Sequence, residues 1–125
     1  MAFFLQDTIK MHDFSEPPRS LGIWGPSTWN VLHMSAYMYP DLPSEEEKSN
    51  QLIFMKRIAT IIPCPMCRTH FRSYIHSPKV NAALESREEL FEYLVDIHND
   101  VNKRNKKEVV DLEVIKKRWE SMHTW

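Results

Sequence analysis

The sequence predicts an all-α protein, a small bundle of packed helices. Only two of its 125 residues are glycine, where average usage of about 7% would give about nine. Hairpin turns with positive φ depend on glycine, so a many-turned barrel or sandwich is disfavoured. The same scarcity excludes the glycine-rich loops of Rossmann and P-loop nucleotide sites. Apolar residues instead recur at helical spacing, behind recognisable helix caps.

One domain is expected, after an N-terminal arm. Residues 1–23 show no sustained period and contain a Pro-Pro pair, so we assign them to an arm and residues 24–125 to the domain. The first helix is expected to start at Pro26, with Gly25 as its cap, and to stop near Pro40. Its apolar face is formed by Trp29, Leu32, His33 and Ala36.

Two further helices are expected on either side of Pro63. Ser44 and Glu47 have the spacing of a capping box and open the second helix. Pro63 ends that helix, and Cys64 starts a short third helix that runs to about His76. The buried stripe of the second helix is Leu52, Met55, Ala59 and Ile62.

Two helices complete the bundle. Ser86 and Glu89 form a second capping box, and Asp111 is placed to cap the last helix. The fourth helix has an apolar face of Phe91, Leu94, Val95, His98, Val101 and Asn102, and the last one of Leu112, Ile115, Trp119 and Met122. Four to five helices with short links predict a small bundle.

Polar residues stand on two of these apolar faces. His33 lies on the first helix, and His98 and Asn102 lie on the fourth. A single buried histidine is usually an ordinary core residue bonded to a carbonyl, but three inward-facing polar groups need partners together. A polar aromatic ligand between the helices, flanked by Trp29 and Trp119, would supply them. Both readings remain open from the pattern alone.

The two cysteines form a C-x-x-C motif, Cys64 and Cys67, at the expected start of a helix. The helix N-terminus favours a thiolate there, and Arg68 and His70 add positive potential, which indicates reversible dithiol/disulfide exchange. Zinc is the alternative, with His70 and His76 as further ligands. A short helix would have to bend back around that ion, so we favour redox chemistry and expect no metal.

The charge balance indicates no general nucleic-acid or membrane partner. The formal net charge is −1, which gives no global field. The basic stretch within residues 103–118 is interpreted as a solvated helix end. No segment approaches the roughly 18 apolar residues of a membrane span, and no signal peptide is recognisable, so we expect a soluble chain.

Four motifs in order resemble one family. WGPSTWNVLHMSA, IPCPMC, IHNDVNKRNKK and KKRW, spread over roughly residues 21–120, together resemble the Erv/ALR family of FAD-dependent sulfhydryl oxidases. The resemblance implies a four-helix bundle with a short fifth helix that cradles FAD, and a homodimer. No cysteine lies in the arm, so the chain resembles the minimal, shuttle-free forms that large DNA viruses encode.

The resemblance also implies roles for individual residues. Cys67 would be the thiol next to the flavin, and Cys64 the sulfur that exchanges with substrate. Pro26 and Met38 depart from the family pattern, where many members carry a basic residue and an aromatic one. The implied FAD contacts are Gly25, Trp29, His33, Tyr37, His98, Asn99, Val101, Asn102, Lys107 and Trp119.

The implied activity is the oxidation of protein thiols to disulfides, with electrons passing through the cysteine pair and FAD to oxygen, which yields hydrogen peroxide. A thiol-bearing substrate protein or a separate shuttle protein would deliver the electrons. A viral chain would work in the host cytoplasm or the virion, and a cellular one in the mitochondrial intermembrane space. The competing readings are a zinc-binding helical interaction module and a thioredoxin-like exchanger, which is disfavoured because no βαβ strands are recognisable.

Overall fold

The computed structural model describes residues 21–121, and the regular elements in that range are all helical. The all-α prediction is confirmed, and a thioredoxin-like framework is wrong because residues 21–121 contain no strand. Most of the predicted arm, residues 1–20, and Met122 lie outside the described residues. The helices are α2 (Leu21–Tyr37), α3 (Glu45–Ile61), α4 (Pro65–Ile75), α5 (Lys79–Ala83), α6 (Arg87–Arg104) and α7 (Leu112–Glu120).

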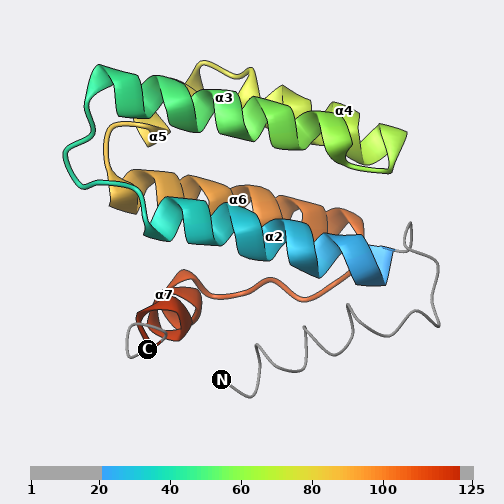
Figure 1. The fold of residues 1–125 in the computed structure, drawn as a ribbon. Helices are drawn as coiled ribbons and strands as arrows, with labels where there is room; N and C mark the ends of the chain where they lie inside the picture. The colour runs from blue at the N-terminus through green and yellow to red at the C-terminus, as the bar shows by residue number, and fades with distance from the viewer. Residues whose placement is uncertain (1–20, 122–125) are drawn as a thin grey trace.

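The long helices form two layers, and α7 lies against one side of them (Figure 1). Helices α3 and α4 pack together in one layer, and α2 packs along α6 in the other. Helix α7 follows on the side of α2 and α6 that faces away from α3 and α4 (Figure 1). The fully buried side chains that join these elements are Leu32, Met55, Ile75, Leu90, Leu94, Val95 and Ile97.

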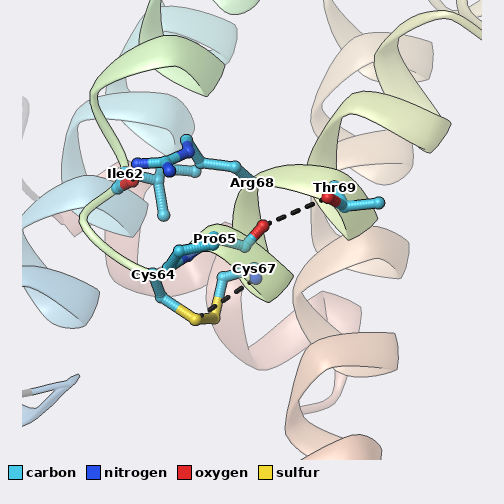
Figure 2. Close-up of a disulfide and its surroundings, with 6 residues drawn as sticks. All are labelled: Ile62, Cys64, Pro65, Cys67, Arg68 and Thr69. Carbon is cyan, nitrogen blue, oxygen red and sulfur yellow. Dashed lines mark hydrogen bonds between the residues drawn. A yellow bond between two sulfur atoms is a disulfide. The ribbon is translucent and has the colours of Figure 1, made fainter.

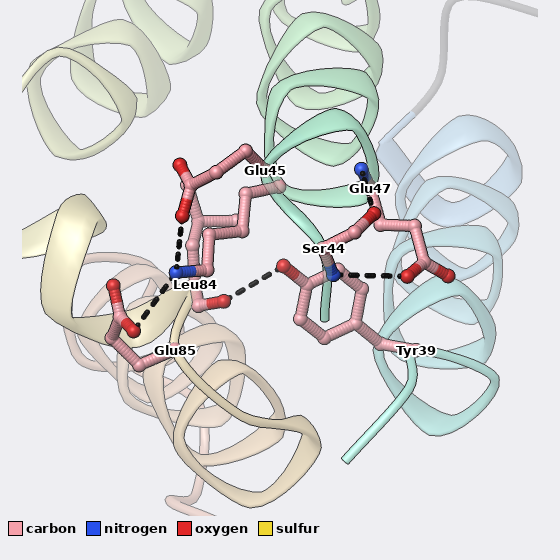
Figure 3. A network of polar contacts seen from close by, with 7 residues as sticks. Tyr39, Ser44, Glu45, Glu47, Leu84 and Glu85 are labelled. Atoms are coloured by element: carbon pink, nitrogen blue, oxygen red, sulfur yellow. Dashed lines mark hydrogen bonds and ion pairs between the residues drawn. The ribbon is translucent and has the colours of Figure 1, made fainter. Parts of the chain in front are cut away.

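Side-chain caps start the helices where the sequence predicts them. The Ser44 hydroxyl accepts a hydrogen bond from the Glu47 amide at 3.1 Å, and the Glu47 carboxylate accepts one from the Ser44 amide at 3.0 Å (Figure 3). Ser86 accepts from the Glu89 amide, and Asp111 caps α7. Each cap satisfies N–H groups that the first helical turn leaves unpaired.

The first helix begins earlier than the sequence predicts. It starts at Leu21, so Gly25 and Pro26 lie inside α2 and neither caps it. Trp24 packs against the core, and this burial offsets the backbone hydrogen bond that a proline inside a helix removes. Leu21–Ile23, which we assigned to the arm, therefore form the first turn of this helix.

A short helix that the sequence did not reveal, α5, fills the connection between α4 and α6. Two contacts fasten its C-terminal end to the first half of the chain (Figure 3). The buried Tyr39 hydroxyl donates to the Leu84 carbonyl at 2.7 Å, and the Lys48 ammonium lies 3.0 Å from a Glu85 carboxylate oxygen. These contacts join residues about 40 positions apart, which local periodicity does not register.

Candidate redox and cofactor site

The two cysteines form a disulfide at the N-terminus of α4 (Figure 2). Cys64 is the N-cap residue and Pro65 occupies the first turn, as proline can where no amide is needed. The Cys67 amide donates a hydrogen bond to the Cys64 sulfur at 3.2 Å. The Arg68 guanidinium donates to the Ile62 carbonyl at 2.8 Å, so it fixes the turn that precedes the disulfide.

A cavity of about 290 Å³ lies between α2, α6 and α7. Its wall is aromatic and amide-rich, with cationic side chains at the link between α6 and α7 and on α7 itself. Eight of the ten residues that the resemblance implies as FAD contacts line it. They are Gly25, Trp29, His33, His98, Val101, Asn102, Lys107 and Trp119.

A pair of histidines, His33 and His98, lies in the lining of this cavity. His33 Nε2 and His98 Nδ1 are 3.0 Å apart, so the N–H of one ring donates a hydrogen bond to the nitrogen of the other. The Trp29 ring stacks on His98, with centroids 4.1 Å apart and planes within 7°. Burial and the neighbouring ring lower the pKa of His33 to about 3, and burial and Lys107 lower the pKa of His98 to about 4. Both rings are therefore neutral at physiological pH.

Among residues 21–121, one polar atom of this pair finds no hydrogen-bond partner. His33 is 4% exposed, and its Nδ1 atom is buried without a partner. An unsatisfied buried nitrogen costs about 1–3 kcal/mol, and native structures keep few of them. Asn30, Asn102 and Asn105 line the cavity, and their amides can bond a ligand with a hydrogen-bonding edge, such as a flavin nucleotide. The donor set thus fits FAD, with aromatic faces for stacking and cations for phosphate.

Lys107 reaches the cavity through a tight turn after α6. Its amide donates to the Asn102 carbonyl at 2.8 Å, and the Asn105 amide donates to the Val101 carbonyl. Lys106 between them has φ of 57°, the left-handed conformation that glycine favours at a helix end. The turn sends the chain back along α6, which brings Lys107 to the cavity wall.

Two of the implied contacts lie elsewhere. The Asn99 side-chain amide donates to the Val110 carbonyl at 2.8 Å and its oxygen accepts from the Val110 amide at 2.9 Å. Asn99 thus fastens the link before α7 to α6, and it does not line the cavity. Tyr37 lies at a separate surface cavity with Arg87 and Lys116. Its ring centroid lies 6.0 Å from that of Trp119, which lines the first cavity, so Tyr37 stands just outside that lining.

Sequence reasoning missed seven other residues of the wall. They are Leu21, Pro26, Asn30, Asn105, Val110, Ile115 and Arg118. Asn30 stands next to Trp29 in the first family motif, and Asn105 follows the last helical residue of α6, so both had a positional signal. Val110 and Ile115 read as ordinary core residues, because only the return of α7 beside α2 places them at the cavity.

Trp29 links the cavity to the disulfide helix. Its ring meets the Phe71 ring edge-on, with centroids 6.4 Å apart, while it stacks on His98. Phe71 follows Cys67 by four residues, so the two share a face of α4. Cys67 and Trp29 both pack against the same buried core.

The ligand sets that zinc needs are not assembled here. Within residues 21–121, no group of three or more His, Cys, Asp or Glu side chains is placed to hold a metal ion. Cys64 and Cys67 are joined to each other, and a disulfide offers no thiolate to zinc.

None of the helices that the structure describes is long and apolar enough to span a bilayer.

Fold and site together define a helical disulfide protein with a ligand cavity, and comparison with known proteins shows its family. The chain belongs to the Erv1 / Alr family, which it matches over residues 26–120. It is 37% identical over 97 residues to the mitochondrial FAD-linked sulfhydryl oxidase ERV1 of Saccharomyces cerevisiae, covering 76% of this chain and 49% of that protein. It is 33% identical over 87 residues to an FAD-linked sulfhydryl oxidase of African swine fever virus, covering 70% and 71%.

The fold is similar to a solved structure of the same family. The crystal structure of the yeast Erv1 core superposes with a TM-score of 0.74 at 34% identity, covering 91% of this chain and 92% of that one. The predicted Erv/ALR-like bundle is thereby confirmed. The chain spans about half the length of the yeast and Arabidopsis thaliana relatives, 49% and 57% respectively.

Proposed function

We propose that this chain is a FAD-dependent sulfhydryl oxidase. It takes two electrons from the thiols of a protein substrate, which becomes a disulfide, and passes them through Cys64–Cys67 and FAD to oxygen, with hydrogen peroxide as product. The observation that carries the proposal is the contact of Trp29 with both the disulfide helix and the cavity wall. The names of the yeast and viral relatives support the same activity.

The cavity residues are suited to hold FAD. His33 and His98 line the cavity with their imidazole rings, and Asn102, which also lines it, has amide groups that can donate and accept. Lys107 and Arg118 supply positive charge for the diphosphate. When bound, FAD supplies the two-electron chemistry that the side chains lack.

The helix N-terminus prepares the disulfide for exchange. The Cys67 amide points at the Cys64 sulfur, and with the helix dipole it stabilises negative charge there. Cys64 is therefore suited to be the sulfur that a substrate thiol attacks and later leaves. Cys67, which shares a face of α4 with Phe71, is suited to be the sulfur nearest the cofactor.

A homodimer and a location belong to the same proposal. Val31 and Met34 on α2 and Met38 directly after it follow each other at spacings of three and four and are exposed, which gives an apolar stripe that a second copy would cover. The yeast relative is named mitochondrial, which fits a mitochondrial location, and the African swine fever virus relative fits the viral alternative. Replacing Met34 with Asp should shift the protein from dimer to monomer in sedimentation, whereas a monomeric unsubstituted chain would contradict the dimer.

The visible spectrum tests the function directly. The purified chain should absorb near ~450 nm from bound flavin, the colour that such a cofactor brings, and should consume oxygen when dithiothreitol is added. A colourless protein that gains no flavin on incubation with FAD would contradict the proposal. So would a flavin-loaded protein that consumes no oxygen with dithiothreitol.

A further inference from the structure

Helices α3 and α4, which hold the disulfide, carry an unusual distribution of charge. From Lys48 to Leu84 the sequence has no Asp or Glu, although the chain has 17 of them. The same 37 residues contain six of the 16 Lys and Arg side chains. Because α3 and α4 pack against each other, this basic stretch forms one layer (Figure 1). The rest of the chain is correspondingly acidic.

Carboxylates occur at the edges of this layer, where Glu45, Glu46 and Glu47 open α3 at the end far from the disulfide. Asp100 of α6 accepts a hydrogen bond from Tyr74, and Glu85 pairs with Lys48. Arg57 and Arg72, on the outer parts of the layer, are exposed. Beyond the first turn of α3, all charged side chains that α3 and α4 contribute are therefore cationic, which favours a partner of negative charge.

Apolar side chains surround the disulfide within this basic layer. Ile61 is 71% exposed and Met66, between the two cysteines, is 69% exposed. Pro63 and Pro65 are exposed as well. We refer to Ile61, Pro63, Pro65 and Met66 as the apolar collar. Exposed apolar groups gathered at a reactive bond are typical of a docking surface.

We propose that the apolar collar and the basic layer select the substrate: a thiol protein with apolar residues beside its cysteines and acidic residues around them. The inference rests on the proposed function, because it names the class of substrate that the disulfide oxidises. Charge complementarity supports this partner, since opposite charge steers encounter and apolar contact holds the complex. A disulfide at the centre of the surface requires that the partner bring a thiol.

The exchange proceeds in two balanced steps. A substrate thiolate attacks the Cys64 sulfur, the Cys64–Cys67 bond breaks, and Cys67 leaves as a thiolate. The second substrate thiolate then attacks the substrate sulfur of the mixed disulfide, which closes the substrate disulfide and releases Cys64 as a thiolate. The substrate loses two electrons and the cysteine pair gains them. The collar holds the first thiolate in line with the S–S bond.

Four reduced peptides with the same cysteine pair test the selection. Their flanking residues are Leu with Glu, Leu with Lys, Ser with Glu, and Ser with Lys. The readout is single-turnover reduction of Cys64–Cys67 in the full chain, followed by alkylation and mass spectrometry, which requires no flavin. We expect the Leu/Glu peptide to react about tenfold faster than the Ser/Lys peptide at low salt. The charge-dependent part should shrink in about 0.5 M salt.

Variants separate the two contributions. Arg57→Glu should slow the acidic peptides about threefold and speed the basic ones, and Met66→Ser should slow only the Leu peptides. Lys117→Glu and Val114→Ser, on exposed positions of α7 away from the collar, are the matched controls and should change neither. Dithiothreitol, which needs no docking, should reduce all variants at rates within about twofold of one another.

Several results would overturn the selection. Equal rates for the four peptides would do so, and so would equal losses with dithiothreitol and peptides in Met66→Ser. If exchange slows as the protein concentration rises, the collar is covered by a second copy. If the four peptides react at equal rates and the chain binds single-stranded DNA or anionic vesicles tightly, the basic layer serves those partners. Oxygen uptake with dithiothreitol tests the proposed oxidase function independently of the peptide selection. If the chain exchanges selectively with peptides but consumes no oxygen, the proposed substrate selection stands and the proposed oxidase function is wrong.

Discussion

The cavity and the disulfide lie in one small bundle, yet their surroundings differ in almost every physical property. At the cavity, His33 and Asn102 are buried, the histidine pair is neutral, and Trp29 is stacked flat on His98. At the disulfide, the neighbouring Met66 is mostly exposed. A cofactor site holds its ligand with few, desolvated contacts, whereas an exchange site must admit another protein. The difference shows how one helical fold can serve both needs.

The largest effect is expected from the cysteines, and it tests whether the two sulfurs have different partners. Cys64→Ser and Cys67→Ser should each lower dithiothreitol turnover about a thousandfold or more, because one thiol cannot complete the exchange. If Cys67 is nearer the cofactor, Cys64→Ser alone should show a long-wavelength charge-transfer absorption with bound FAD. The band in Cys67→Ser instead would reverse the assignment.

The second effect tests whether the buried polar residues serve the cofactor. His98→Ala removes the stack on Trp29 and leaves His33 without its ring partner. Unfolding free energy should fall by about 2–4 kcal/mol. Flavin occupancy should also fall and recover in part with excess FAD, since ligand binding adds RT ln(1 + [L]/Kd). His76→Ala, at an exposed position, is the control. Full occupancy and stability in His98→Ala would make the cavity an incidental feature.

The third effect is a loss of stability in acid, which we expect the two cavity histidines to cause. His33 and His98 have pKa values lowered to about 3 and about 4, against 6.5 in the unfolded chain. Below pH 6.5 the unfolded chain binds more protons, so stability should fall as the pH drops towards 4. The slope is at most about 1.4 kcal/mol per pH unit for each histidine.

A matched pair of variants assigns this slope. His33→Gln cannot take up a proton and should flatten the dependence of denaturation midpoints on pH between 6 and 4. His76→Gln, at an exposed position outside the cavity, is the matched control. An equally steep dependence in His33→Gln would place the acid sensitivity outside the cavity.

The smallest effect sharpens the comparison at the turn that delivers Lys107. Lys106→Gly should raise the free energy of unfolding by about 0.5–1 kcal/mol, because glycine adopts positive φ without the strain of a Cβ atom. Denaturant unfolding measures the change. Disulfide exchange with dithiothreitol should stay as it is, since the turn contacts only the cavity side. A destabilised variant would show that the turn is not strained.

Local signals account for most of the helix boundaries. Each N-cap side chain bonds to amides no more than three residues away, as Ser44, Ser86 and Asp111 show. A cap can therefore be recognised from a short stretch of sequence. The sequence gives no comparable signal for the end of α6. A glycine usually occupies the left-handed position after a helix, but here Lys106 adopts that conformation. Helix α2 was predicted too short, since Gly25-Pro26 reads as a helix start unless the burial of Trp24 is known.

The site divides in the same way. The C-x-x-C spacing, the caps and the polar residues on apolar faces were determined by the sequence alone, because each depends on residues within a turn or two. Only the tertiary structure joined His33 to His98 across 65 positions, used Asn99 to fasten Val110, and placed Tyr37 beside Trp119. The physical reason is that rotation of one helix against another decides which side chains meet. That rotation is set by packing of the whole core, and no short stretch of sequence contains it.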